Sequence, residues 1–122
     1  LEKAAYYFEK AIQQKPDAVD SMQYYLEVLQ QKQDFQRLVS KATAFSELFP
    51  TQPNYYFYAG WGCNQMKNYQ KAKAYLENGL DFVLDDQPLE ILFYEQLIIS
   101  CENLNDNAKK ETYTNKLKQL QK

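Results

Sequence analysis

The 122-residue sequence predicts an all-α protein built from repeated pairs of antiparallel helices. Apolar residues recur at intervals of three and four rather than two, which is the spacing of one face of a helix. The chain contains only three glycines and four prolines, and the prolines lie between the apolar runs. Pro16 and Pro50, each closing such a run, are 34 residues apart. About 34 residues is the length of one common helix-pair repeat.

These patterns predict seven helices, which correspond to three and a half helix pairs. The expected helices span residues 1–14, 18–31, 35–48, 53–66, 69–85, 88–103 and 107–121. Because the first of them is the second helix of a pair, the chain is expected to open inside a truncated unit.

A second series of residues supports the same period. Asp34, Asn68 and Asp106 each precede the second helix of a pair, where a short polar side chain can cap the free backbone N–H groups. The first two are 34 residues apart and the last two 38. The longer interval predicts an insertion near residues 83–88, which either extends helix 69–85 or loosens its exit.

The packing positions of each unit follow one pattern of small and large side chains. Helix 1–14 contributes Ala4, Phe8 and Ala11, and the next pair contributes Met22, Tyr25, Leu26, Leu29, Leu38, Ala42 and Phe45. The third unit contributes Tyr56, Ala59, Gly60, Cys63, Ala72, Leu76 and Gly79, and the fourth Tyr94, Leu97, Ile98, Cys101, Lys110, Thr114 and Leu117. In order and spacing these residues resemble the loose pattern of the tetratricopeptide repeat family.

The resemblance implies a right-handed superhelical solenoid in a single domain, and it suggests a C-terminal-type piece of a longer, bacterial-like solenoid. Residues 1–16 are expected to form the second helix of a truncated repeat, and residues 17–50 and 51–86 to form full repeats, the latter with the insertion. Residues 87–122 are expected to form a degenerate repeat. Polar Lys110 and Thr114 replace packing residues there, so the last helix is expected to be a polar cap.

In similar proteins the first helix of each pair lines a concave groove. The matching positions here are Asp20, Gln23, Glu27, Gln30, Gln31, Asn54, Phe57, Trp61, Asn64, Gln65, Leu92, Glu95, Ile99, Glu102 and Asn103. Of these, Gln23, Glu27, Gln30, Phe57, Trp61 and Asn64 are expected to bind a peptide. Phe57 and Trp61 lie four apart on one helix face and are expected to be its exposed anchors. The alternative is that a neighbouring helix, upstream repeats or another copy of the chain covers both rings.

The charged residues of the chain limit the kind of partner that it is expected to bind. The net charge is −2, Arg37 is the only arginine, and the chain has no histidine. Lysines are scattered rather than gathered into a stripe, so nucleic-acid binding is not expected. None of the fifteen groove positions is basic, which argues against a clamp for acidic C-termini and favours neutral or basic partners.

Catalysis, metal binding and a cofactor are not expected. Cys63 and Cys101 occupy equivalent positions of successive units, too far apart for a disulfide, and are expected to be buried free thiols. Asp81, Asp85 and Asp86 form an acidic cluster that is read as a solvated helix end and turn. No glycine-rich phosphate loop or nucleophile motif is present.

The expected function is therefore that of a protein–protein interaction module that binds an extended peptide or a partner segment in the groove. The alternative is a structural spacer or self-association element of a longer repeat protein. Because helix 1–14 lacks the helix that it should pack against, it is a candidate surface for a homodimer. No membrane-spanning segment is expected.

Overall fold

The computed structural model describes residues 19–121, and within that range the chain forms six α-helices and no β-strand. They are α2 (Val19–Lys32), α3 (Phe35–Leu48), α4 (Pro53–Gln65), α5 (Tyr69–Leu80), α6 (Gln87–Asn103) and α7 (Asn107–Leu120). The all-α prediction is confirmed. The expected helix 1–14, and with it the dimer contact proposed for that helix, lies outside the described residues.

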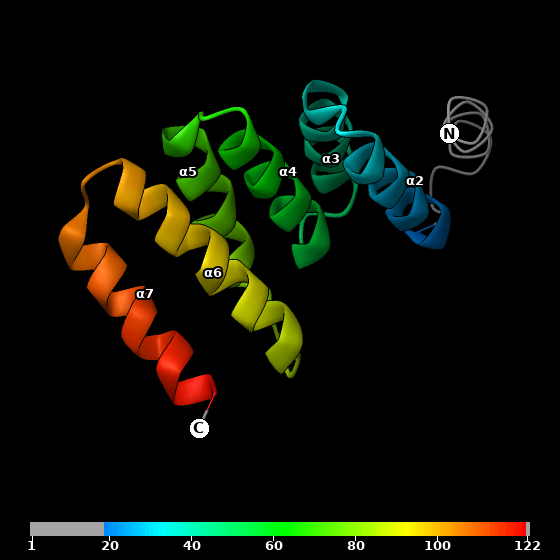
Figure 1. The fold of residues 1–122 in the computed structure, drawn as a ribbon. Coiled ribbons are helices and arrows are strands. Elements are labelled where there is room, and N and C mark those ends of the chain that lie inside the picture. Colours follow the sequence, from blue (N-terminus) through cyan, green and yellow to red (C-terminus); the bar gives the residue numbers. More distant parts are fainter. Residues whose placement is uncertain (1–18, 122) are drawn as a thin grey trace.

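The helices form three pairs, α2 with α3, α4 with α5 and α6 with α7, laid side by side along the chain (Figure 1). The backbones of α2 and α4, and of α4 and α6, come into close contact. Among the described residues no such backbone contact joins α3 to α5 or α5 to α7. Because one layer of helices is closer together than the other, the row curves, with α2, α4 and α6 on its inner side.

One continuous core runs through the described helices. Its fully buried members include Met22, Tyr25, Leu26, Leu38, Ala42, Leu76, Phe93 and Leu97. Two glycines allow the closest approaches between helices. A Cβ added at Gly60 would overlap the side chain of Leu76, and one added at Gly79 would overlap the Cβ of Tyr56. The packing positions that the repeat pattern predicted in the third unit are thus confirmed as helix contacts.

Two of the three predicted caps are confirmed. The Asp34 carboxylate accepts from the backbone N–H of Arg37 at 3.4 Å, and that of Asp106 accepts from the N–H of Lys109 at 3.2 Å. Asn68 occupies the N-cap position of α5, but its side chain makes no capping bond, so that prediction is wrong.

The end of α5 was also predicted wrongly, because the helix stops at Leu80 rather than at residue 85. Phe82 leaves the helix yet stacks on Tyr56, with ring centroids 5.8 Å apart. The insertion therefore loosens the exit of the helix instead of extending it. Asp86 caps α6 by accepting from the N–H of Leu89 at 3.1 Å, so the acidic cluster is partly a helix start.

Tyr113 is the one buried residue of α7, and the sequence pattern missed it. Its ring stacks on Tyr94 with centroids 5.9 Å apart, and its hydroxyl donates to the Glu77 carboxylate at 2.5 Å. Lys110 and Thr114 are only half-buried. The helix is polar as expected, and it packs on the core through Tyr113 and the half-buried Leu117 and Leu120.

We expect α7 to open before α4 and α5 because it buries so little apolar surface. Amide hydrogen exchange should show faster exchange in residues 107–120 than in residues 53–80. Equal protection of the two segments would show that Tyr113 and its contacts couple α7 fully to the rest of the solenoid.

Candidate binding surface

The candidate site is the inner surface, defined here as the solvent-facing side of α2, α4 and α6. All six residues expected to bind a peptide lie on two of these helices. Gln23, Glu27 and Gln30 are on α2, and Phe57, Trp61 and Asn64 are on α4. The structure gives these side chains three different environments.

Phe57 is not exposed. Only 8% of the residue is accessible, and its ring lies 5.6 Å from that of Phe93 on α6 and 5.7 Å from that of Tyr58. The expectation of an open aromatic anchor at this position is wrong. The neighbouring helix α6 covers the ring, as in the alternative stated above.

Trp61 is half-buried at the edge of the inner surface. Its ring meets that of Phe35 on α3 edge to face, with centroids 5.4 Å apart and planes at 69°. This contact fixes the indole against the core while leaving part of it accessible. Of the two predicted anchors, only Trp61 can therefore contact a ligand without a rearrangement of the helices.

Asn64 joins α4 to α6. It is 6% exposed, and its amide nitrogen donates to the backbone carbonyl of Gln96 at 3.1 Å and to the Gln96 side-chain oxygen at 3.0 Å. The hydroxyl of Ser100 donates to the Asn64 carbonyl oxygen at 2.7 Å. Because a buried amide is costly unless its groups are paired, this network fixes the relative position of the two helices.

Gln23 joins α2 to α4 in the same way, but in a more exposed position. Its amide nitrogen donates to the Tyr58 hydroxyl at 2.9 Å and to the Glu27 carboxylate at 3.3 Å. Asn54 donates to the Gln23 carbonyl oxygen at 3.3 Å. Tyr58 was not among the residues predicted from the sequence, where its only signal was its position one residue after Phe57.

Gln30 is half-buried, and most of the remaining inner surface is exposed. The helices α2, α4 and α6 carry no basic side chain beyond Lys32 at the end of α2. The exposed members are Glu27, Gln31, Gln65, Leu92, Glu95, Ile99, Glu102 and Asn103. One of these acids, Glu102, forms an ion pair with Lys110 of α7, whose ammonium lies 3.7 Å from the carboxylate. The surface is therefore acidic and amide-rich.

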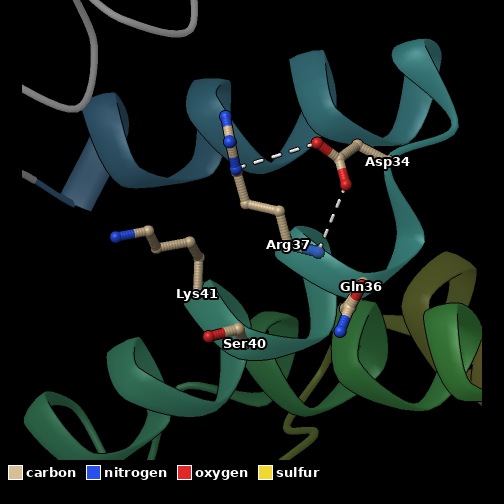
Figure 2. A pocket seen from close by; sticks show the side chains of 5 residues that line it. All are labelled: Asp34, Gln36, Arg37, Ser40 and Lys41. Atoms are coloured by element: carbon tan, nitrogen blue, oxygen red, sulfur yellow. Dashed lines mark hydrogen bonds and ion pairs between the residues drawn. The ribbon is translucent and has the colours of Figure 1, made fainter.

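A separate polar hollow of about 490 Å³ lies beside the first turns of α3 (Figure 2). It is lined by Asp34, Gln36, Arg37, Ser40 and Lys41. Asp34 engages Arg37 twice, through the backbone N–H and through the guanidinium at 3.7 Å (Figure 2). The hollow includes none of the six predicted binding residues, and its chief acid already serves as a helix cap.

The two cysteines are buried free thiols, as predicted. Burial raises the pKa of both the Cys63 and the Cys101 thiol, which keeps them protonated and poorly nucleophilic near neutral pH. Within residues 19–121, no group of three or more histidine, cysteine, aspartate or glutamate side chains could hold a metal ion.

We expect the protein to lose stability in alkaline solution through its buried tyrosines. Burial raises the pKa of Tyr58 and of Tyr94 to about 12, from an ordinary value of 10.0. Burial also raises the pKa of Tyr113. Since the unfolded chain ionises these phenols first, the folded state loses stability as pH rises from about 10 toward 12, and the full contribution is present below pH 10.

Urea denaturation at a series of pH values from 8 to 11 measures this loss. The Tyr58→Phe variant should show a shallower fall, because it has one fewer shifted phenol. A denaturation midpoint that stays constant across pH 10 in the unmodified protein would contradict the prediction.

None of the helices in the described part of the chain combines the length and the apolar content needed to cross a membrane. No protein-family model and no curated protein matches the sequence.

Solved structures resemble the fold closely. MamA 41-end from Desulfovibrio magneticus RS-1 superposes with a TM-score of 0.80 at 17% sequence identity, over 98% of this chain and 66% of that one. The MamA RS-1 ArsTM double mutant gives a TM-score of 0.82 at 17% identity, over 98% and 65%. MamA MSR-1 C2 gives 0.78 at 17% identity, over 98% and 67%. The chain thus spans about two thirds of the length of the chains it matches, and it has a tetratricopeptide-like solenoid fold.

Proposed function

We propose that the chain is a non-catalytic protein-interaction scaffold whose inner surface binds a segment of a partner protein. The fold supports this, because repeat solenoids present extended concave surfaces for binding. The observation that carries the proposal is the pair of polar networks centred on Gln23 and Asn64, which hold α2, α4 and α6 in fixed positions. A surface fixed before binding loses less entropy when a partner docks.

The proposed contact residues are Glu27, Gln30 and Trp61. Glu27 is exposed, and Gln30 and Trp61 are half-buried. Side-chain amides both donate and accept, so Gln30 can pair with the backbone of a bound segment, while the indole adds apolar area at low entropy cost. Gln23 and Asn64 serve this surface by positioning the helices.

The partner should be neutral or basic. Among the exposed residues of the inner surface, the charges are those of Glu27, Glu95 and Glu102. Complementary charge on the partner would speed association, and added salt should weaken it because the acids are exposed.

A second candidate function is that of a structural spacer or self-association element. It is favoured by the use of Phe57, Gln23 and Asn64 in contacts between helices rather than on an open surface. The two functions differ in stoichiometry. A mass that doubles or grows with protein concentration in light scattering would favour the second.

Affinity capture from a lysate of the source cells tests the first function. The baits are the unmodified chain, a Glu27→Lys and Trp61→Ala double variant, and a Glu47→Lys control, whose substituted residue is exposed on α3. All three must show the same helical circular dichroism. We expect a protein that the unmodified chain and the control retain and the double variant loses; recovery of the same proteins by all three baits would refute inner-surface binding at these residues.

A further inference from the structure

One face of α6 is apolar and acidic, and the packing of the described helices leaves it uncovered. Leu92 is 44% exposed and Ile99 is 40% exposed, and the two are seven residues apart on the helix. Glu95 and Glu102, also exposed and seven apart, alternate with them. These four residues are called the α6 stripe.

The stripe is not required for the core. The buried side of α6 is formed by Phe93, Tyr94, Leu97, Ser100 and Cys101, which face α4, α5 and α7. Single exposed apolar side chains are ordinary on a protein surface. Leu92 and Ile99, by contrast, lie on the same side of the helix with charged residues between them. Together they form a continuous surface that a second helix can contact.

Negative charge is concentrated around this stripe. Residues 81–103 contain six of the chain's sixteen aspartates and glutamates and none of its fourteen lysines and arginines. Asp81, Asp85 and Asp86 are exposed where the chain enters α6. Glu95 has no ion-pair partner among the described residues, whereas Glu102 lies 3.7 Å from Lys110 in an exposed pair that a ligand can replace.

The spacing of the stripe selects the conformation of its ligand. Residues seven apart in a helix are separated by about 10.5 Å along the axis. In an extended strand, side chains on one face recur about every 6.6 Å, so they cannot match both apolar positions. A second helix has the same seven-residue recurrence and stays in register along the stripe.

We propose that the α6 stripe binds an amphipathic helix of a partner protein, with apolar residues seven apart that pack on Leu92 and Ile99 and with lysines or arginines that face Glu95 and Glu102. This inference rests on the proposed scaffold function and specifies the partner's chemistry. It places the principal contact on α6, in addition to the residues of α2 and α4 discussed above.

The probe for this proposal is a displayed library of random 18-residue peptides, selected on the full 122-residue chain. Enriched peptides are then synthesised and their affinities are measured by fluorescence anisotropy. The test variants are Ile99→Ser and Glu95→Lys. The matched controls are Leu48→Ser and Glu47→Lys, which alter an exposed leucine (56% accessible) and an exposed glutamate on α3.

We expect enriched peptides to carry apolar residues seven apart with flanking lysines or arginines, and to gain helical circular dichroism on binding. Each test variant should weaken binding about tenfold, since each removes one apolar or one charged contact. The controls should bind like the unmodified chain, and all variants should remain folded with the same helical circular dichroism.

Three results would overturn the proposal. If the selected peptides bind both test variants as tightly as the unmodified chain, the α6 stripe is not the binding site, although the scaffold function would still stand. A folded chain that selects no peptide would contradict both. A concentration-dependent mass that Ile99→Ser returns to that of a monomer would show that a second copy, rather than a basic helix, occupies the stripe.

Discussion

Replacing Phe57 by alanine should lower the free energy of unfolding by about 3 to 5 kcal/mol, the usual cost of truncating a buried phenylalanine. The ring is 8% exposed and lies between Tyr58 and Phe93, so its loss leaves a cavity at the contact between α4 and α6. Since the free energy of unfolding of single domains is only about 5 to 15 kcal/mol, this one change should remove much of the stability of the protein.

Urea denaturation monitored by circular dichroism measures the effect, and Tyr24→Ala is the matched control. Tyr24 is also an aromatic residue on an inner-layer helix, but it is 53% exposed, so its truncation should have a much smaller effect. Similar losses for the two variants would mean that Phe57 is accessible after all. The result also determines how binding experiments are interpreted. If a Phe57→Ala chain fails to capture a partner, the cause is unfolding of the chain rather than loss of a contact with the partner.

Gly79→Ala should destabilise the protein by about 1 to 3 kcal/mol, although alanine is the better helix former by about 1 kcal/mol. The added methyl group would overlap the Cβ of Tyr56 and lie 3.0 Å from the ring of Phe93. A Cβ is fixed to the backbone, so Tyr56 cannot rotate away, and the helices α4 and α5 must separate.

The neighbouring residue supplies the control for this prediction. Asn78 lies on the same helix but is exposed, so Asn78→Ala should raise stability by a few tenths of a kcal/mol through helix propensity alone. Opposite signs at adjacent positions are the expected result of thermal melts. If Gly79→Ala were also stabilising, the close contact with Tyr56 would not exist in solution.

The repeat period predicted the fold well because it rests on contacts within a helix pair, which each unit reproduces. Ala72 and Leu76 are fully buried at the positions that the pattern assigned. The same pattern did not predict where α5 ends. Phe82 packs on Tyr56 from a turn, and an apolar residue that reaches the core from a turn looks in the sequence like the continuation of a helix.

The candidate site was harder to predict because an inner-layer helix has neighbours on several sides. Eight of the thirteen residues of α4 are buried, so the apolar pattern does not mark one face as open. Whether Phe57 meets solvent depends on Phe93, 36 residues further along the chain, and on how α6 crosses α4. Those are properties of the packed solenoid rather than of either segment.

The two layers of the solenoid also differ in mechanical terms. The inner helices are joined by close backbone contacts and by the buried Asn64 network, which tolerates little change of length. The outer helices α5 and α7 are bridged by the tips of long side chains, such as the pair of Glu77 on α5 and Lys109 on α7 at 3.3 Å. A force that bends the solenoid should therefore change the distances between the outer helices, while the distances between the inner helices stay nearly constant. The solenoid can then flex without altering the spacing of the groups on its inner surface.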